Sequence, residues 1–235
     1  MNHPVAVITG AGKGIGRATA IEMARRGYAL AVAARNENDL LSTLNSANAS
    51  DRGVAMPTDV SKPAEVDRLI DGAIDHFGRI DAVIHCAGFA PVTPIAEMTI
   101  ADWHTVIDTN LSAAFYLARA VWPQMKRQGG GSIVNVSSLA SRDPFPGFAA
   151  YAAAKAGVNL FGLSAAREGQ ADGIRVYTIA PGAVETEMFR KILTHEQYPK
   201  DKTLDPSDVA KVIAGCVAGD LRYACGEVIY LHRTV

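Results

Sequence analysis

Tyr151 and Lys155 lie four residues apart in the segment Tyr-Ala-Ala-Ala-Lys, and a helical period places them one turn apart on one face. A lysine ammonium beside a phenol stabilises the phenolate, so we expect Lys155 to lower the pKa of Tyr151 toward working pH. Tyr151 would then serve as a general acid in carbonyl reduction, or as a general base in alcohol oxidation. The alternative is a core tyrosine beside a lysine that reaches the surface.

Ser138 is the second side chain with usable chemistry. It follows the apolar run 132–137, which we predict to be a strand, and open α/β sheets bind their ligands at the carboxyl ends of the strands. Its hydroxyl could bond a substrate oxygen and steady Tyr151. Ser137 is the neighbouring candidate, but successive strand residues face opposite ways. A serine at a strand end is otherwise a turn residue.

A glycine-rich stretch, TGAGKGIG at 9–16, joins the apolar run 5–9 to a helical period. Backbone N–H groups and the helix dipole favour a phosphate at such a turn. We expect Gly10 to allow the tight turn, Gly14 to allow close approach of a pyrophosphate, and Gly16 to allow close packing of helix on strand. The alternative is a turn whose glycines are merely structural.

The elements that would position these residues alternate along the chain. Short apolar runs, which we predict to be strands of a buried parallel sheet, occupy 5–9, 29–34, 54–56, 81–85, 132–137, 174–180 and 227–231. Amphipathic stretches predict helices at 15–26, 63–77, 100–127, 148–170 and 206–218, the last with Asp205 as N-cap and Pro206 in its first turn. This alternation, with no linker, predicts an α/β doubly wound sheet and a single domain over 1–235.

Composition excludes several classes of function. The chain has 235 residues, 49% of them hydrophobic, and a net charge of −1 with scattered Lys and Arg, so neither nucleic acid nor a membrane surface is expected as a partner. The histidines and cysteines have no metal-ligand spacing, so we expect no metal. The odd count of three cysteines indicates a reducing compartment. With no signal-like segment and no apolar run near the roughly 18 residues of a membrane span, a cytoplasmic protein is expected.

Six features in this order resemble the short-chain dehydrogenase/reductase family over roughly residues 4–231. They are T-G-x-x-x-G-x-G at 9–16, Asp-Val at 59–60, Asn110 in IDTNL, Ser138 thirteen residues before Tyr151, Y-x-x-x-K at 151–155, and APG at 180–182 followed by Thr186. The resemblance implies a Rossmann fold with a mostly parallel seven-stranded sheet, in the order 3-2-1-4-5-6-7, and helices on both faces.

The same resemblance implies roles for individual residues. The catalytic set would be Asn110, Ser138, Tyr151 and Lys155. Asn110 would interrupt its helix and hold a water, and Lys155 would hold the nicotinamide ribose hydroxyls and pass protons. The cofactor contacts would be Gly10, Gly12, Lys13, Gly14, Ile15, Gly16, Arg35, Asn36, Asp59, Val60, Cys86, Ala87, Gly88, Tyr151, Lys155, Pro181, Gly182, Val184 and Thr186.

One motif departs from the family pattern. The family commonly has Asn-Asn-Ala-Gly where this chain has His85-Cys86-Ala87-Gly88. Gly88 still permits the cofactor to approach, and Cys86 can offer its backbone carbonyl, so we expect adjusted packing rather than lost binding. A catalytic Cys86 would need an activating group, and the sequence shows none nearby.

The end of the second strand favours NADP(H) over NAD(H). An NAD enzyme places an acidic residue about 20 positions past the glycines, whereas this chain has Ala33-Ala34-Arg35. The Arg35 guanidinium suits a 2′-phosphate, and Lys13 adds a second cation. Glu37 is the only competing acid, and its position suits the first turn of a helix.

The substrate is less well defined than the reaction. Apolar residues of the segment near 186–205, expected to be a short substrate lid, and of the loop after Ser138 suggest a modest apolar pocket: Leu139, Phe145, Phe148, Met188, Phe189, Ile192 and Leu193. The segment PGAVETEM resembles 3-oxoacyl-[acyl-carrier-protein] reductases, but Asp172 stands where that group often has a basic residue. A general ketone, aldehyde or sugar reductase is equally open. A non-catalytic NADP-binding sensor or scaffold is the alternative, and a methyltransferase would not need Y-x-x-x-K.

Small residues dominate the segment around Tyr151, and the resemblance implies a homotetramer, with a homodimer second. The helix there could pack on its own sheet, or could meet a two-fold mate together with the helix at 100–127. The C-terminal segment 226–235 could supply a second interface.

Overall fold

Seven parallel strands form one sheet. The computed structural model describes residues 3–233. The strands are β1 Val5–Thr9, β2 Ala29–Ala34, β3 Gly53–Pro57, β4 Ala82–His85, β5 Gly131–Val136, β6 Ile174–Pro181 and β7 Val228–Leu231. Their order is β3-β2-β1-β4-β5-β6-β7, with every neighbouring pair parallel. The expected strand order and doubly wound architecture are confirmed.

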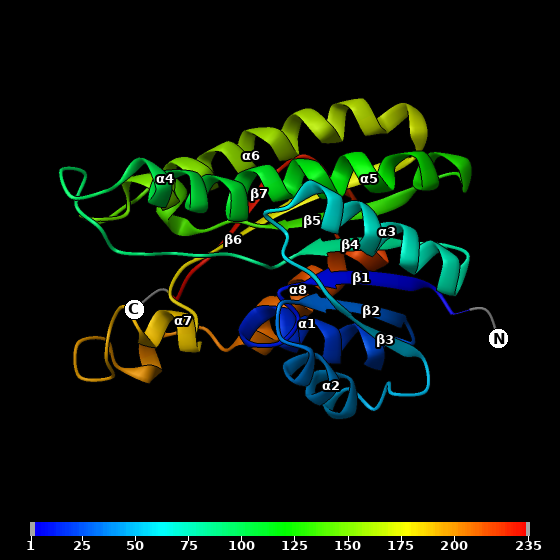
Figure 1. Cartoon of the computed structure of the whole chain (residues 1–235), viewed down its shortest axis with the longest axis horizontal. Helices are drawn as coiled ribbons and strands as arrows, with labels where there is room; N and C mark the ends of the chain where they lie inside the picture. The colour runs from blue at the N-terminus through cyan, green and yellow to red at the C-terminus, as the bar shows by residue number, and fades with distance from the viewer. Residues whose placement is uncertain (1–2, 234–235) are drawn as a thin grey trace.

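Helices cover both faces of this sheet (Figure 1). One layer holds α1 Gly14–Arg25, α2 Glu37–Ser46 and α8 Pro206–Ala218, and the other holds α3 Pro63–Phe77, α4 Ile100–Ile107, α5 Ala113–Arg127 and α6 Ala149–Gly169. The short α7 Glu187–Arg190 lies with its flanking loops at the carboxyl end of the sheet. Asp205 caps α8 as expected, because its carboxylate accepts a hydrogen bond of 2.8 Å from the Ser207 amide.

The strands are apolar on both faces because each face meets a helical layer. Ile8 and Val32 pack in the core beneath α1 and α8, whereas their neighbours Val7 and Ala31 pack in the core beneath α3 and α5. Successive strand side chains point to opposite faces, so a strand buried on both sides reads as a continuous apolar run.

The helix expected over 100–127 is interrupted at Asn110, as the family resemblance implies. A π-helical turn, Asp108–Ser112, separates α4 from α5. At its centre the Asn110 side-chain amide donates to the Val106 carbonyl at 2.9 Å. That carbonyl is the acceptor the Asn110 backbone amide would use in a regular α-helix, so the side chain competes with the helical ladder at this point.

Two neighbouring leucines of α2 differ in burial, so substituting each one tests how α2 packs on the core. Leu40 is fully buried, whereas Leu41 is 48% exposed. Leu40→Ala should lower the free energy of unfolding by about 2–5 kcal/mol, because it leaves a cavity in the core. Leu41→Ala should change it by less than about 0.5 kcal/mol. Urea unfolding of both variants measures the difference, and equal effects would show that α2 does not pack as described.

Candidate functional site

The residues expected to carry chemistry meet at the carboxyl end of the sheet. The glycine loop follows β1, Gly88 lies three residues past the end of β4, and Ser138 lies two residues past β5. Tyr151 and Lys155 come from the first two turns of α6. Four separate elements therefore bring their ends together at one edge, as open α/β sheets do at ligand sites.

Lys155 is the most constrained member of this group. Its side chain is 3% exposed, and its Nζ donates to the Val136 carbonyl at 2.8 Å. Burial lowers the pKa of Lys155 to about 8. The ammonium lies 5.6 Å from the centroid of the Tyr151 ring.

The expectation that Lys155 lowers the pKa of Tyr151 is wrong for this structure. Burial raises the pKa of the Tyr151 phenol to about 12, and the Ser138 hydroxyl offsets only part of that increase. Desolvation disfavours the Tyr151 phenolate more strongly than the Ser138 hydrogen bond favours it. Tyr151 therefore holds its proton at neutral pH, which is the state required of a proton donor.

The two serines after β5 have different partners. The Ser137 hydroxyl is buried and donates to the Lys155 carbonyl at 3.2 Å, which ties α6 to the sheet. Ser138 is partly exposed, and its hydroxyl oxygen accepts a bond of 3.1 Å from the Ala140 amide. Ser138, not Ser137, is thus the residue placed to meet a substrate near Tyr151.

Asn110 fastens the π-helical turn to the loop after β4. Its amide nitrogen donates to the Phe89 carbonyl at 2.8 Å, and its amide oxygen accepts from the Phe89 amide at 3.3 Å. A Cβ on Gly88 would lie 3.0 Å from that oxygen and 3.8 Å from Lys155 Nζ. Gly88, Asn110 and Lys155 are therefore in close contact, whereas the water expected on Asn110 remains a proposal.

The glycine loop has the close contacts that only glycine permits. Gly10 has φ of +65°, and a Cβ there would lie 2.6 Å from the Ala87 amide nitrogen. A Cβ on Gly16 would lie 2.2 Å from the Gly10 carbonyl oxygen. The loop is thus pressed against both the β4 loop and its own helix, as expected for the turn and packing glycines.

The residues of this loop fit a bound pyrophosphate. Gly14 opens α1 with φ of +52°, and a Cβ there would meet the Thr186 methyl at 3.1 Å. The first-turn amides of a helix have no intrahelical acceptor, and they attract anions. Gly14 and Thr186, more than 170 residues apart in sequence, therefore lie close together at the expected cofactor site.

The two cationic residues expected near the cofactor, Arg35 and Lys13, differ in whether they form ion pairs. Arg35 is exposed, and within residues 3–233 it forms no ion pair. Lys13 instead pairs with Glu187 of α7 at 3.1 Å and approaches Asp39 at 3.9 Å. A 2′-phosphate would meet an available charge at Arg35 but would compete with two carboxylates for Lys13.

Asp39 of α2 also approaches the glycine loop, which corrects the expectation that Glu37 is the only competing acid. A Cβ on Gly12 would lie 2.9 Å from the Asp39 Cβ. Asp39 lies one helical turn beyond Asn36, whose side chain caps α2 by accepting from the Asp39 amide at 3.3 Å. A strand-end motif does not reveal this approach, because the curvature of the β2–α2 turn determines it.

The remaining expected cofactor contacts occupy the rim of the same edge. The Asp59 carboxylate accepts from the Ser61 hydroxyl at 2.7 Å, and the Gly182 amide donates to the Leu231 carbonyl at 2.7 Å. Val60 and Val184 are buried. The others in this group are Ile15 at the start of α1, Cys86 and Ala87 after β4, and Pro181 at the end of β6. Their positions suit the expectation, and their contacts with a cofactor remain predictions.

The His85-Cys86 pair is structural in character. His85 is buried at the end of β4, and its Nδ1 lies 2.9 Å from the Thr9 hydroxyl. Burial, helped by the Lys155 charge, lowers the pKa of His85 to about 3, so the imidazole is neutral. Burial raises the pKa of the Cys86 thiol to about 12, which leaves it protonated and unreactive.

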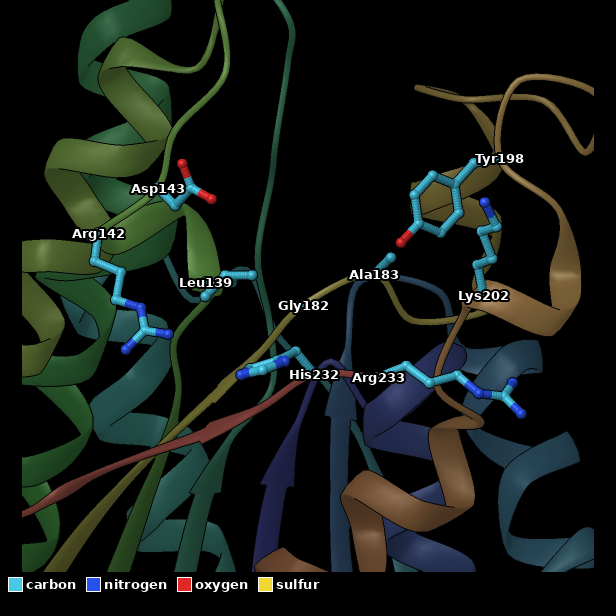
Figure 2. A pocket seen from close by; sticks show the side chains of 9 residues that line it. All are labelled: Leu139, Arg142, Asp143, Gly182, Ala183, Tyr198, Lys202, His232 and Arg233. Carbon is cyan, nitrogen blue, oxygen red and sulfur yellow. The ribbon is translucent and has the colours of Figure 1, made fainter. Parts of the chain in front are cut away.

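A cavity of about 310 Å³ opens beside Ser138, and its lining is mainly polar and charged, unlike the apolar pocket expected from the sequence. Figure 2 shows the side chains around it. They are Leu139, Arg142, Asp143, Gly182, Ala183, Tyr198, Lys202, His232 and Arg233. Of the expected apolar residues only Leu139 is among them. Phe148 instead stacks on Phe145 at 3.9 Å and on Tyr151 at 5.2 Å between centroids.

The sequence analysis missed the charged residues of this cavity. Their position in the chain could have predicted some of them, because any residue just past the end of a parallel strand lies at the same edge of the sheet. His232 and Arg233 directly follow β7, and Arg142 is four residues past Ser138. Tyr198 and Lys202 come from the loops after α7, whose path no strand period predicts.

Neither a metal cluster nor a membrane span is found in the described part of the chain. Over residues 3–233 no three His, Cys, Asp or Glu side chains gather as metal ligands would. No helix in that range has the length and apolarity of a membrane span.

Comparison with known proteins connects this site to one family. A sequence model described as short chain dehydrogenase matches residues 4–197. An uncharacterised oxidoreductase of Staphylococcus haemolyticus is 33% identical over 91% of this chain and 90% of its own. The 3-oxoacyl-[acyl-carrier-protein] reductase FabG of Vibrio cholerae is 32% identical over 97% of this chain and 95% of its own.

The three-dimensional comparison agrees with the sequence comparison. A short-chain type dehydrogenase/reductase from Mycobacterium ulcerans superposes with a TM-score of 0.89 at 26% identity, covering 97% of this chain and 88% of that one.

The buried His85 makes a prediction about pH and stability. The folded imidazole stays neutral down to about pH 3, whereas in the unfolded chain it gains a proton below its ordinary pKa of 6.5. The unfolded state therefore binds more protons between these values, and stability falls as the pH falls below 6.5. The contribution is about 1.4 kcal/mol per pH unit.

Urea unfolding between pH 6.5 and 5 measures this slope as a difference between variants. His85→Asn should reduce the slope by about 1.4 kcal/mol per pH unit. His104→Asn, which changes an exposed histidine of α4, should leave the slope as in the wild type. Parallel curves for the wild type and His85→Asn would show that His85 is not held neutral.

Proposed function

Because this chain belongs to the short chain dehydrogenase family of oxidoreductases, we propose that it transfers a hydride between NADP(H) and a carbonyl compound or secondary alcohol. One observation carries the proposal above the others. Tyr151, a protonated phenol, lies between the partly exposed Ser138 hydroxyl and the buried Lys155 ammonium, at the end of the sheet that holds the glycine loop.

In this proposal the chain's own residues supply orientation and the proton. NADPH, when bound, supplies the hydride. Ser138 would hold the carbonyl oxygen by a hydrogen bond, and Tyr151 would donate its proton to that oxygen as negative charge develops. Lys155 would place a positive charge beside the phenolate left behind. Asn110 would keep the β4 loop against α6, so that Gly88 and Lys155 stay in register.

Arg35 is the main support for NADP(H) over NAD(H). Its exposed guanidinium stands one residue past the end of β2 and acts electrostatically on Asp59. Asp39 would accept a ribose 2′-hydroxyl in an NAD enzyme, but Lys13 lies 3.9 Å from its carboxylate. The choice between NADP(H) and NAD(H) therefore depends on whether Arg35 or Asp39 contributes more to binding. We propose that Arg35 does, which favours NADP(H).

The carbonyl compound stays open between two groups. The named relative from Vibrio cholerae favours a 3-oxoacyl thioester. Asp172 stands where an acidic carrier protein would favour a cation. Its carboxylate pairs with Lys126 at 2.9 Å and accepts from the Trp122 indole at 3.0 Å, so it is part of a surface network. A general ketone, aldehyde or keto-sugar reductase fits equally. NADPH oxidation across both groups of compound separates them.

A non-catalytic NADP-binding sensor or scaffold is the second candidate. It would have no need of Ser138, Tyr151 and Lys155 together, and this chain retains all three. A cytoplasmic enzyme remains our expectation for location, because a reducing compartment suits the three free cysteines, Cys86, Cys216 and Cys225.

Self-association completes the proposal. Some small residues of α6 serve the chain's own packing, since Ala150 and Ala154 are buried against Val106 of α4. Others do not, and the same layer exposes Phe115 of α5 at 49% and Leu160 of α6 at 69%. This exposed apolar surface supports a homotetramer built on isologous contacts, with a dimer second. Residues 234–235 of the C-terminal segment proposed as the other interface lie outside the described residues.

Removing the phenolic hydroxyl tests the reaction. Tyr151→Phe should keep cofactor binding and lose about 10²–10⁴-fold in kcat, because only the transferable proton is gone. Tyr223→Phe, which changes a tyrosine that is 89% exposed, should retain wild-type turnover. If Tyr151→Phe kept its turnover on a carbonyl compound that the wild type reduces, the proton would have to come from another group.

Removing the Arg35 guanidinium tests the cofactor. Arg35→Ala should weaken NADPH binding by about 1.5–3 kcal/mol and leave NADH binding nearly unchanged, because only NADPH carries the 2′-phosphate. Arg167→Ala, an exposed position near the end of α6, is the matched control and should affect neither. Equal losses for both nucleotides, measured by fluorescence titration, would contradict the assignment.

Light scattering at micromolar concentration tests the assembly. The wild type should have about four times the 24.9 kDa mass of one chain. Leu160→Glu should reduce that mass by placing a charge in the interface. A wild-type mass near 24.9 kDa would refute self-association.

A further inference from the structure

The charged cavity beside Ser138 has a composition that a neutral substrate does not require. We propose that the compound reduced or oxidised here carries an anionic group, a carboxylate or a phosphate, which Arg142 binds from one side of the cavity while Lys202 and Arg233 add positive charge on the other. This inference rests on the proposed function, because it assigns the substrate class of the same site.

The cavity adjoins the reacting groups. Leu139 directly follows Ser138 in the chain, and Gly182 directly follows the end of β6. A Cβ on Gly182 would lie 3.5 Å from a Leu139 methyl and 3.5 Å from the His232 Cβ, so the two sides of the cavity meet at this glycine. A substrate whose carbonyl oxygen lies at Ser138 would therefore extend its remaining atoms toward these residues.

The charge of the lining is positive and uncompensated. Arg142, Lys202 and Arg233 stand against the single carboxylate of Asp143. Over residues 3–233 none of these three cations has a carboxylate within ion-pair distance. The nearby Glu185 does not neutralise them, because its carboxylate is held by Arg190 at 2.8 Å and by the Thr203 hydroxyl at 3.1 Å.

Arg142 is held in place by an aromatic ring, and within residues 3–233 it has no carboxylate partner. Its guanidinium carbon lies 4.1 Å from the centroid of the Tyr230 ring. The Tyr230 hydroxyl lies 3.4 Å from the hydroxyl of Ser141, which donates to the Ser138 carbonyl at 2.7 Å. The same Tyr230 hydroxyl also accepts from Asn159 of α6 at 3.4 Å. Stacking fixes the plane of the guanidinium and leaves its N–H edge free for a forked bond to an oxyanion.

The other lining groups add hydrogen-bond donors from the opposite side. In Figure 2 the Arg142 guanidinium points toward His232, and the Tyr198 hydroxyl points inward from the loops after α7. Lys202 and Arg233 lie on that same side of the cavity, and the Arg233 guanidinium points away from Arg142. Among residues 3–233, the Arg233 guanidinium has one hydrogen-bond partner, the Thr203 carbonyl at 3.4 Å. An anion that enters the cavity would thus meet cations from two separate parts of the chain.

Matched pairs of small ketones test the proposal by equilibrium binding at low ionic strength. The carboxylate pair is 4-oxopentanoate and its methyl ester, and the phosphate pair is dihydroxyacetone phosphate and dihydroxyacetone. In at least one pair the charged member should bind at least about tenfold more tightly, which is the effect of hydrogen bonds to a charged group. The pair that shows the difference identifies the anionic group.

Three variants assign the effect to the cavity. Arg142→Gln should weaken binding of the charged member by about tenfold or more, whereas Asp143→Asn should strengthen it, an effect that misfolding cannot imitate. Arg222→Gln is the matched control, because Arg222 also stacks on a tyrosine, Tyr223, at 5.1 Å but lies outside the cavity. It should bind as the wild type does.

The outcomes separate this inference from the proposed function. Tyr151→Phe should retain the preference for the charged ketone even though reduction is lost, so a failed reaction does not hide the anion site. Equal binding of the charged and neutral members of both pairs would overturn the inference. Unchanged binding in Arg142→Gln, Asp143→Asn and Lys202→Gln would also overturn it, whether or not carbonyl reduction is observed.

Discussion

A buried ammonium is the constraint on which this site depends. Lys155 is 3% exposed, and a charge withdrawn from water is destabilising unless polar groups meet it. The Val136 carbonyl, freed at the end of β5, meets it at 2.8 Å. The Ser137 hydroxyl donates to the Lys155 backbone carbonyl. Lys155 of α6 is therefore attached to the end of β5 through both its side chain and its backbone. Tyr151, one turn earlier, is positioned by the same attachment.

The polar groups around Lys155 depend on one another. Asn110 uses its whole amide on Val106 and Phe89, and this contact breaks the helix and holds Gly88 close to the ammonium. His85 stays neutral beside them because burial disfavours its charged form, and the Lys155 ammonium adds to that effect. The cavity cations are different, since they lie toward solvent, where positive charges are tolerated and can attract an anionic ligand.

The sequence predicts the fold well because strands buried on both faces and amphipathic helices leave a strong periodic pattern. The sheet order and the clustering of Ser138, Tyr151 and Lys155 follow from the family resemblance and the parallel topology. Features that depend on three-dimensional approach were missed or wrong. Examples are the approach of Asp39 to Gly12 and the burial that raises the pKa of Tyr151. Local sequence does not encode desolvation, because segments far along the chain produce it.

Isotope tracing is the most direct test of carbonyl reduction at this site. NADPH labelled with deuterium on the transferable position of the nicotinamide would be incubated with thioesters, ketones, aldehydes and keto-sugars, and the alcohol products analysed by mass spectrometry. One deuterium on the former carbonyl carbon is the predicted result, with the hydroxyl proton drawn from solvent through Tyr151. No oxidation of NADPH by any of these compounds, or an alcohol without deuterium on that carbon, would contradict it.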